Sequence, residues 1–599
     1  MRVFCLLSAL VLPLVICDRF EEELLVKDFG NGFSGFHFNF VTQKKLGDDH
    51  HFHIFPKPLY NILTKYSVSE FHLSMVKGHW DRLKWGPPFV PSASGGAEIW
   101  AWFSPTTSNV DASWTYFLEA LSGQFCASLS QLGLPKNYIS PSLSHRPSGL
   151  FQKITSQNVS SVFRYAQFSH EEVCTENLTP WSKLLPCKKI GGLASMLKPK
   201  SIFKATYSAL FTDVRCVCTD DKCKQFSLEL KQSLTIVFDR RHMYGSIQEP
   251  WSLIGLLGDE MTKSCPVASR SEIIILSSQP QLLLDPPADV TSIVNWDVRR
   301  VLAVYSPSYN FANNLTITSF LPIETPRSST VNEEGVSVMK YSTGKGDVGG
   351  GVRVELRNNL AVPVPVVLLD SAPWYAEIYF SSLTITRQYP DGSAPVVITP
   401  DKVTFQPSVR RKQMAFLELL LTLPPGACVT VSYAFTKVLM RWNEYLPDAN
   451  HGVYLPAASV VYQFSPEQLD RLRASRNPVT WELALPLWAS TYAEYLSAAN
   501  TSRQGTKPLG DGLLRLYSEA LLIRLPVPDF SMPFNALCLV CSVVAILFGS
   551  IHKLTTCGLV PVVAEGDEDV VDKPPIVRLF QKLKILFQRL HRRSHLKNE

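Results

Sequence analysis

The 599-residue chain lacks the short motifs that identify common hydrolases and nucleotide-binding enzymes. It contains no G-x-S-x-G elbow, no H-E-x-x-H zinc helix, no Walker loop and no Q-A-C-x-G nucleophile of the caspase type. Charge is also scarce, since 18% of residues are charged and the formal net charge is +6. Because 46% of residues are hydrophobic and 11% aromatic, long disorder is excluded, and this weak positive charge does not indicate a nucleic-acid partner.

Two G-x-G-x-x-G matches, which begin at Gly30 and Gly344, do not indicate a dinucleotide site. Such a site needs glycines that open a helix, whereas both runs lead into the strand-like segments 36–40 and 352–356. Neither run is therefore expected to bind a cofactor, and we expect no cofactor in the chain.

Two further features resemble sites only superficially. The three histidines His50, His51 and His53 lie beside two aspartates, but no second group of metal ligands is evident, so a solvated loop is the better interpretation. Cys174 could act as a thiol nucleophile with a distant histidine, but cysteines in an oxidising compartment are mostly cross-linked. We therefore expect no metal site and no catalytic residue.

Long hydrophobic runs are restricted to the two ends of the chain. Residues 1–17 carry one basic residue followed by an apolar run, which predicts a secretory signal peptide cleaved near Cys17. The 18 residues 534–551 carry no charge and, as a helix, span about 27 Å, so 530–551 is predicted to cross a membrane once. Nine basic and six acidic residues follow this run, which predicts a cytosolic C-terminus and a lumenal or extracellular segment 18–529.

The tail 552–599 is too short for a domain. Apolar residues recur at three- and four-residue steps over 576–590, with basic residues between them. This pattern predicts an amphipathic basic helix, either on the anionic cytosolic lipid surface or against a partner protein.

Eight cysteines lie in the predicted lumenal part, where most should be paired. They are Cys126, Cys174, Cys187, Cys216, Cys218, Cys223, Cys265 and Cys428. The close group from Cys216 to Cys223 lacks the paired C-x-x-C spacing of zinc sites, so disulfides are favoured over metal, although the sequence does not choose the pairing.

Four glycosylation sequons also lie in the predicted lumenal part. Asn158, Asn314 and Asn500 are predicted to carry glycans, in agreement with the topology. The sequon at Asn177 is a poor acceptor because Pro180 follows it directly.

Hydrophobic periodicity predicts an α+β fold rich in strands, with a mixed α/β region over 18–225 and one or more β-sandwich domains over 226–529. Helices are expected near 58–65 and over 111–132, and a strand over 98–103. The sandwich strands are expected at 352–356, 364–369, 378–386, 396–399, 414–423 and 429–435, with a loop or hairpin tip over 328–351.

Several long blocks containing tryptophan and proline occur in a characteristic order. They are Trp85-Gly-Pro-Pro-Phe89, Phe125-Cys-Ala-Ser-Leu129, Val173-Cys-Thr-Glu-Asn-Leu-Thr-Pro-Trp181, Leu184-Leu-Pro-Cys187, Leu368-Leu-Asp-Ser-Ala-Pro-Trp-Tyr375, Glu444-Tyr-Leu-Pro-Asp-Ala-Asn-His-Gly452 and Pro528-Asp-Phe-Ser-Met-Pro-Phe-Asn535. Together, over nearly the whole chain, they resemble the PIG-T subunit family of the glycosylphosphatidylinositol (GPI) transamidase.

The resemblance implies a non-catalytic scaffold subunit of an endoplasmic reticulum membrane complex that joins GPI anchors to proteins. It implies a caspase-like catalytic partner, PIG-K, linked by a disulfide to Cys174, together with other transamidase subunits, the GPI lipid and the proprotein substrate. Intrachain disulfides are implied among Cys126, Cys187, Cys218, Cys223 and Cys265, while Cys216 and Cys428 look like additions to the family pattern.

At the membrane boundary, we expect Phe534 and Asn535 to lie near bound GPI, or else to form a simple interfacial anchor. Two other functions stay open at this point: a lumenal hydrolase with two juxtaposed carboxylates, and a cell-surface adhesion or receptor ectodomain built from sandwiches.

Overall fold

The computed structural model describes most of the chain between residue 18 and residue 556. The described residues are 18–29, 32–46, 54–86, 88–89, 93–147, 159–188, 190–218, 226–244, 250–277, 282–287, 290–295, 299–305, 315–319, 335–344, 348–445, 448–463, 514–527, 531–556 and a few single residues. The chain divides into two compact units, Met1–Val527 and Pro528–Glu599.

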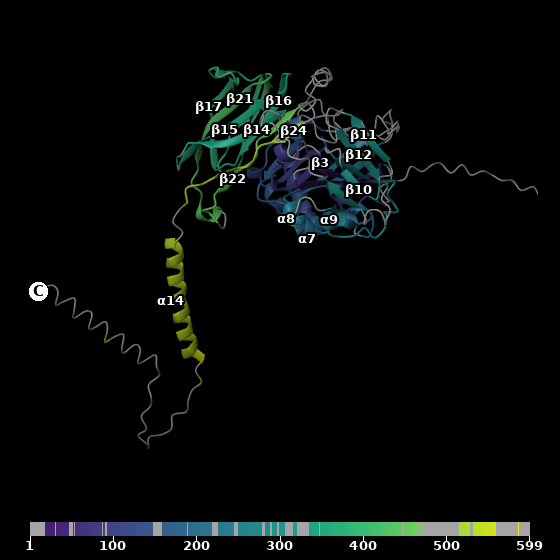
Figure 1. Ribbon diagram of the computed structural model, residues 1–599. Helices are drawn as coiled ribbons and strands as arrows, with labels where there is room; N and C mark the ends of the chain where they lie inside the picture. The colour runs from purple at the N-terminus through teal and green to yellow at the C-terminus, as the bar shows by residue number, and fades with distance from the viewer. Residues whose placement is uncertain are drawn as a thin grey trace, which may run out of the picture. The chain divides into compact units, whose positions relative to one another are not determined.

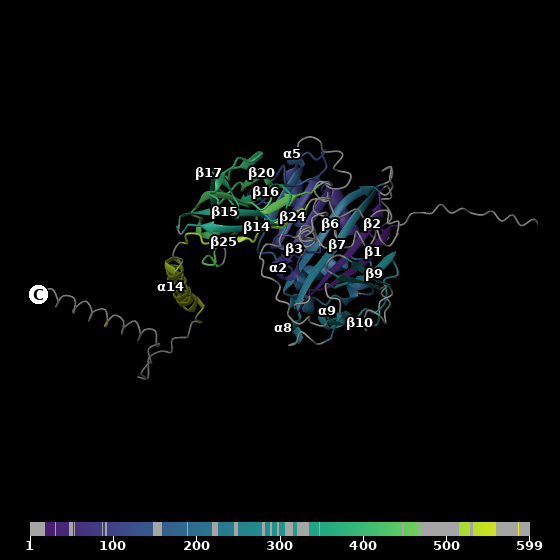
Figure 2. The ribbon, with the colours of Figure 1, turned by 45° about the horizontal axis from the view of Figure 1, so that its top comes forward.

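A ten-stranded sheet organises the first part of the larger unit (Figure 1). Its strands follow the spatial order β11-β12-β9-β1-β2-β7-β6-β3-β4-β5, and every described pairing is antiparallel except β1 with β9. The bounds are β1 (Arg19–Asp28), β2 (Phe33–Lys45), β3 (Val68–Lys77), β4 (Gly96–Phe103), β5 (Phe163–Phe168), β6 (Tyr207–Cys218), β7 (Phe226–Asp239), β9 (Arg270–Ser277), β11 (Val290–Asn295) and β12 (Arg299–Tyr305). Figure 2 shows β6, β7, β2, β1 and β9 side by side.

Helices cover one face of this sheet and form the largest core with it. The apolar face of the longest one, α3, buries Trp114, Phe117 and Leu121 at helical spacing against strand residues such as Phe71. The helices of this part are α1 (Lys57–Lys65), α2 (Arg82–Trp85), α3 (Val110–Phe125), α5 (Val159–Val162), α6 (Thr175–Lys183), α7 (Pro199–Phe203), α8 (Arg240–Tyr244) and α9 (Leu253–Leu257), with 3-10 turns η1 (Ser128–Gly133), η2 (Pro135–Asn137) and η3 (Leu193–Met196). A small sheet of β10 (Leu282–Asp285), β13 (Thr316–Ser319) and β8 (Trp251–Ser252) adjoins them.

The opposite face of the sheet is packed by aromatic side chains from the segment after β3. Trp80, Trp85 and Phe89 surround Phe29 at the end of β1, with ring centroids 5.1–6.5 Å apart. Gly35 makes this possible, because a Cβ atom there would lie 2.8 Å from the Phe29 ring. The first glycine run therefore serves packing on strand β2 and does not open a helix.

Two five-stranded sheets form the second part, a β-sandwich with its own core. One has the order β14-β15-β21-β17-β18 and the other β19-β20-β16-β23-β24. Their strands are β14 (Val336–Thr343), β15 (Gly349–Asn358), β16 (Val364–Ala372), β17 (Ala376–Gln388), β18 (Val396–Val397), β19 (Lys402–Gln406), β20 (Ala415–Leu423), β21 (Cys428–Lys437), β23 (Ser459–Tyr462) and β24 (Leu514–Tyr517); β22 (Val453–Leu455) pairs with β25 (Leu521–Ile523), and η4 (Trp442–Glu444) precedes them.

Three expectations differ from the structure. The sandwich was placed from residue 226 onward, whereas β7 begins there and pairs with β2 and β6 of the first sheet. The segment 328–351 is expected to be a loop or hairpin tip; a hairpin is present, with its turn at the second glycine run, but 336–343 form strand β14 and pair with β15. The helix over 111–132 ends at Phe125, because Cys126 takes a left-handed conformation and a 3-10 turn follows.

Buried polar contacts join the first part to the sandwich. The Glu418 carboxylate on β20 accepts hydrogen bonds from the backbone N–H groups of Ser142, Leu143 and Ser144 at 2.8–3.1 Å. Nearby, the hydroxyls of Tyr165 and Tyr517 both donate to Glu98, at 2.7 and 2.9 Å. These two carboxylates are fully buried, so each depends on its donors for the solvation that water would otherwise supply.

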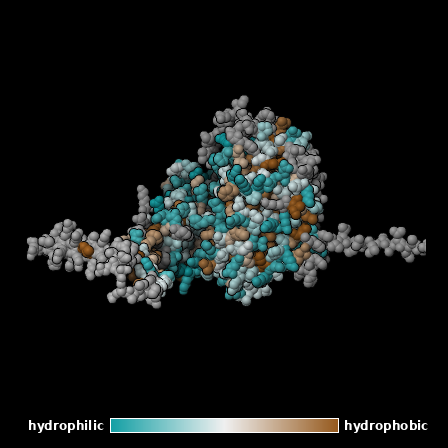
Figure 3. All heavy atoms as spheres, turned by 90° about the horizontal axis from the view of Figure 1, so that it is seen from below, coloured by the Kyte–Doolittle hydropathy of each residue, from teal (hydrophilic) through white to brown (hydrophobic). Residues whose placement is uncertain are grey.

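Apolar residues on the surface are scattered in the view of Figure 3, where small brown patches lie among a larger hydrophilic area. The buried apolar residues of the large unit form the cores described above. The smaller unit contains α14 (Ser531–Thr556), whose apolar stretch Phe534–Thr556 is long enough to cross a membrane.

Candidate functional site

Cys174, the residue expected to bond to another chain, lies at the N-cap of α6 with a free and partly exposed thiol. Its Sγ donates a hydrogen bond to Oδ1 of Asn177 at 2.8 Å, and its backbone N–H donates to the same oxygen at 3.1 Å. The helix begins here because Asn177 returns to cap it, and the first helical bond runs from Leu178 N–H to the Cys174 carbonyl. The position of the Cys174 thiol is therefore fixed by the capped start of α6.

Asn177 also connects Cys174 to the end of α3. Its Nδ2 donates to the carbonyl oxygens of Phe125, at 3.3 Å, and Cys126, at 3.0 Å. The side chain is fully buried. A glycan on Nδ2 has no room in this arrangement, so the structure excludes Asn177 from the usable sequons.

Helix α6 is fixed to the large sheet through Trp181. The indole is fully buried, and its Nε1 donates to the carbonyl of Phe211 on β6 at 3.2 Å. Gln232 on β7 donates in turn to the carbonyl of Trp181 at 3.0 Å. Because both hydrogen-bond partners of Trp181 lie on central strands of the sheet, α6 holds Cys174 on a rigid support.

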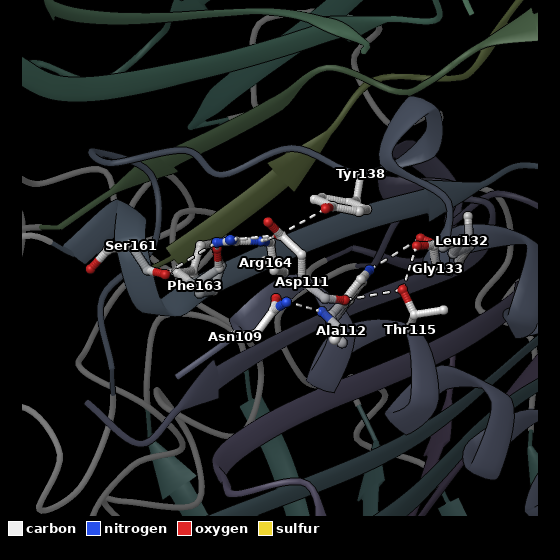
Figure 4. Close-up of polar contacts among 11 residues, drawn as sticks. Asn109, Asp111, Ala112, Thr115, Leu132, Gly133, Tyr138, Ser161, Phe163 and Arg164 are labelled. Carbon is white, nitrogen blue, oxygen red and sulfur yellow. Dashed lines mark hydrogen bonds and ion pairs between the residues drawn. The ribbon is translucent and has the colours of Figure 1, made fainter. Parts of the chain in front are cut away.

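The start of α3 is anchored by a second polar network, drawn in Figure 4. Asp111 Oδ1 accepts from Arg164 Nε and from the Tyr138 hydroxyl, both at 2.7 Å (Figure 4). Burial and the hydrogen bond to Asp111 raise the pKa of Tyr138 to about 12, so its hydroxyl remains a donor. Asn109 caps the helix through the N–H of Ala112 at 3.0 Å.

The loop that leads to Cys174 contacts the sandwich part of the chain. The ring of His170 lies 4.9 Å from that of Tyr454 on β22 and 6.4 Å from that of His451. Burial, with a smaller contribution from His451, lowers the pKa of His170. The neutral imidazole is therefore the form that this contact favours at neutral pH.

The other cysteines fall into three groups. Cys187 and Cys265 form a disulfide with a Cα–Cα distance of 5.8 Å, and Cys218 is also disulfide-bonded. Cys126, one of the cysteines expected among the intrachain disulfides, has a free and exposed thiol in this structure. Cys216 and Cys428 are also free; Cys223 lies outside the described residues.

Phe534 and Asn535 both lie in the first turns of α14 and are exposed. The other predicted sites lie outside the described residues: Asn158, Asn314, Asn500, His50, His51, His53, residues 1–17 and the tail over 576–590, of which only Ile585 is described. Within the described ranges, no group of three or more His, Cys, Asp or Glu side chains is placed to hold a metal ion.

The sequence did not reveal that Asn177 links Cys174 to Cys126. Nor did it reveal that Glu418 links the first part of the large unit to the sandwich. In the sequence, Asn177 stands out only as a sequon and as part of the Val173–Trp181 block, and neither indicates a contact with Cys126; a single Glu on a strand gives no signal of burial. Burial and long-range partners made both residues important, and neither property has a local signature.

The family follows from comparison with known proteins. A family model described as "Gpi16 subunit, GPI transamidase component" matches residues 4–246 and 243–584. The chain belongs to this family. A human protein, "GPI-anchor transamidase component PIGT", is 35% identical over 558 residues, which cover 90% of each chain.

Fungal relatives extend this result. "GPI transamidase component PIG-T homolog" of Schizosaccharomyces pombe is 26% identical and covers 93% of each chain. "GPI transamidase component GPI16" of Saccharomyces cerevisiae is 23% identical over 91% of this chain and 89% of its own length. The protein is therefore a component of a GPI transamidase, and a separate lumenal hydrolase or an adhesion ectodomain is no longer needed to explain the sequence.

Proposed function

We propose that this chain is the non-catalytic scaffold of the GPI transamidase, and that a disulfide from Cys174 ties it to the caspase-like catalytic subunit, PIG-K. The observation that carries the proposal is the setting of Cys174: a free, partly exposed thiol at the start of a helix that is anchored to the largest core. A thiol placed in this way can reach a second chain without local unfolding.

The physical benefit of such a bond is a high effective concentration. Once two subunits are covalently joined, every weaker contact between them forms intramolecularly, and the assembly persists even where those contacts are modest. The rigid seat of Cys174 adds orientation, since α6 is fixed through Trp181 to strands β6 and β7. The scaffold would thereby stabilise the catalytic subunit and help to present GPI and the proprotein to it.

The proposed location is the endoplasmic reticulum membrane, with 18–529 in the lumen and the tail in the cytosol. The apolar stretch of α14 has 23 residues, which at 1.5 Å per residue gives about 35 Å, enough for one span. Glycans at Asn158, Asn314 and Asn500 belong to the same proposal. Two measurements test this orientation. Endoglycosidase H should remove these glycans once the membranes are opened with detergent. In sealed membranes, the lumenal part should be protected from added protease.

The covalent link is tested on a non-reducing gel of the purified complex. We expect a species with the summed mass of the two subunits, which Cys174→Ser removes and which Cys428→Ser leaves intact. Cys428 is the matched control because it is also free and partly exposed. Two separate subunit bands in the wild-type lane would contradict the covalent link.

The non-catalytic role has its own test. The full chain, purified without other subunits, should leave a model proprotein and GPI unchanged, and addition of the catalytic subunit should be needed for transamidation. Turnover by the lone chain would contradict the proposal.

The start of α14 is the proposed place of contact with GPI. Asn535 and Phe534 are exposed there, and an amide near the membrane boundary can hydrogen-bond polar lipid headgroups. We expect Asn535→Leu to lower co-purification of GPI several-fold, while Ser550→Leu, near the other end of the helix, leaves it unchanged. Equal GPI recovery from both variants would leave Asn535 as part of an interfacial anchor.

A further inference from the structure

Two free cysteines lie on opposite sides of the Asn177 side chain. Cys174 Sγ donates to its Oδ1 at 2.8 Å, and its Nδ2 donates to the carbonyl of Cys126 at 3.0 Å. One carboxamide group and two hydrogen bonds therefore separate the sulfur of Cys174 from the backbone of Cys126. A further bond, from Ser128 N–H to Glu171 Oε1 at 2.9 Å, holds the two segments together.

The backbone of Cys126 is unusual for its residue type. Its φ of 51° and ψ of 47° place it in the left-handed region at the end of α3, where its N–H donates to the carbonyl oxygen of Ser122. Glycine or asparagine usually occupies such a position, because other L residues are strained there. An exposed cysteine there places a thiol on the surface at some cost to stability.

We propose that Cys126 is the internal exchange partner of Cys174. In a chain without its catalytic partner, Cys126 and Cys174 form an intrachain disulfide, made by a lumenal disulfide oxidoreductase whose own disulfide is reduced to two thiols. The thiolate of the incoming subunit then attacks the Cys174 sulfur, the new interchain disulfide forms, and Cys126 leaves as the thiolate. The exchange is reversible and needs no further oxidant.

The exchange half of this inference rests on the proposed function, whereas the intrachain bond does not. A disulfide joins Cα atoms that are usually 4.4–6.8 Å apart, so closure requires the Cys174 thiol to leave Asn177 and turn toward Cys126. Both thiols are free and neither is enclosed by the core, so this movement involves side chains at the surface. Before assembly, the Cys126–Cys174 disulfide would prevent Cys174 from bonding to the thiols of other proteins.

The first experiment uses the full chain expressed in the secretory pathway without the catalytic subunit. Free thiols are blocked with N-ethylmaleimide under denaturing conditions, and the digest is mapped by mass spectrometry. We expect a peptide pair linked through Cys126 and Cys174, unchanged in Cys428→Ser. Two blocked thiols at these positions in most molecules would overturn the inference, whatever the gel of the complex shows.

The second experiment follows exchange in the assembled complex. Incubated without blocking agent, the wild-type complex should slowly lose its covalent species as the Cys126 thiolate attacks Cys174. Cys126→Gly should slow this loss at least fivefold, and because glycine suits the left-handed backbone, this variant should fold at least as well as the wild type. Equal rates in both complexes would overturn the exchange step, even if Cys174 does link the subunits.

Discussion

Glu418 provides the sharpest test of how the two parts of the large unit are joined. Its carboxylate lies on sandwich strand β20, is fully buried, and accepts three backbone N–H groups from residues 142–144, more than 270 positions earlier in the chain. The Ser144 hydroxyl adds a fourth bond at 2.8 Å. Replacement by alanine leaves these donors buried without an acceptor.

The expected cost follows from that geometry. A hydrogen bond to a charged group contributes about 1.5–3 kcal/mol, but the three N–H groups share one carboxylate and their contributions do not add in full. Each buried donor left without an acceptor costs about 1–3 kcal/mol, so for the neutral donors that Glu418→Ala leaves behind we expect a total loss of about 3–5 kcal/mol. Glu418→Gln keeps one acceptor oxygen and should cost about half as much.

Two measurements check this on the full chain in detergent. Urea unfolding followed by tryptophan fluorescence gives the loss of stability, since Trp102 belongs to, and Trp100 packs against, a buried cluster that contains residues of both parts, such as Phe416 of β20. Hydrogen exchange reports directly on the amides of residues 142–144, which should exchange much faster in both variants. The control is Glu377→Gln, whose partner Arg410 is 62% exposed and whose loss should cost less than about 1 kcal/mol. Unchanged exchange at 142–144 in Glu418→Ala would refute the reasoning.

Two further predictions concern other buried groups. Lys340→Met should destabilise the sandwich by about 3–5 kcal/mol in urea unfolding, because Lys340 Nζ donates to Asp370 Oδ1 at 2.7 Å and both side chains are fully buried; a loss below about 1 kcal/mol would contradict this. Burial, with the charge of Lys231, lowers the pKa of His37 to about 3, below its value in the unfolded chain, so the unfolded state binds the proton more tightly. The stability that neutral His37 contributes is complete above about pH 6.5 and falls as the pH drops, by about 2 kcal/mol at pH 5, and His37→Leu should flatten that part of the stability curve.

Local patterns were good guides where one face of an element is buried and the other exposed. The sandwich strands expected at 352–356 and 429–435 correspond to β15 and β21, in which buried and less buried residues alternate. The helix at 58–65 corresponds to α1, where proline stands at the first helical turn.

Patterns failed where burial is two-sided or where pairing is distant. Strand β7 is buried along almost its whole length, so its alternation does not reveal that it belongs to the first sheet. Strand β14 lies in a segment rich in Ser, Thr and Gly, a composition that suggests a loop, and the buried ion pair of its Lys340 with the distant Asp370 has no local signal.

The amino-acid sequence by itself determined the family, the prediction of one membrane span, the strand-rich class and the conspicuous Cys174 block, because these depend on composition, local period and long ordered motifs. Only the tertiary structure decided which cysteines meet: Cys187 bonds to Cys265 across 78 residues, while Cys126 and Cys174 remain free on either side of Asn177. The physical reason is that disulfides and buried hydrogen bonds depend on distances of a few ångströms between remote segments, and those distances are set by the packing of the whole sheet.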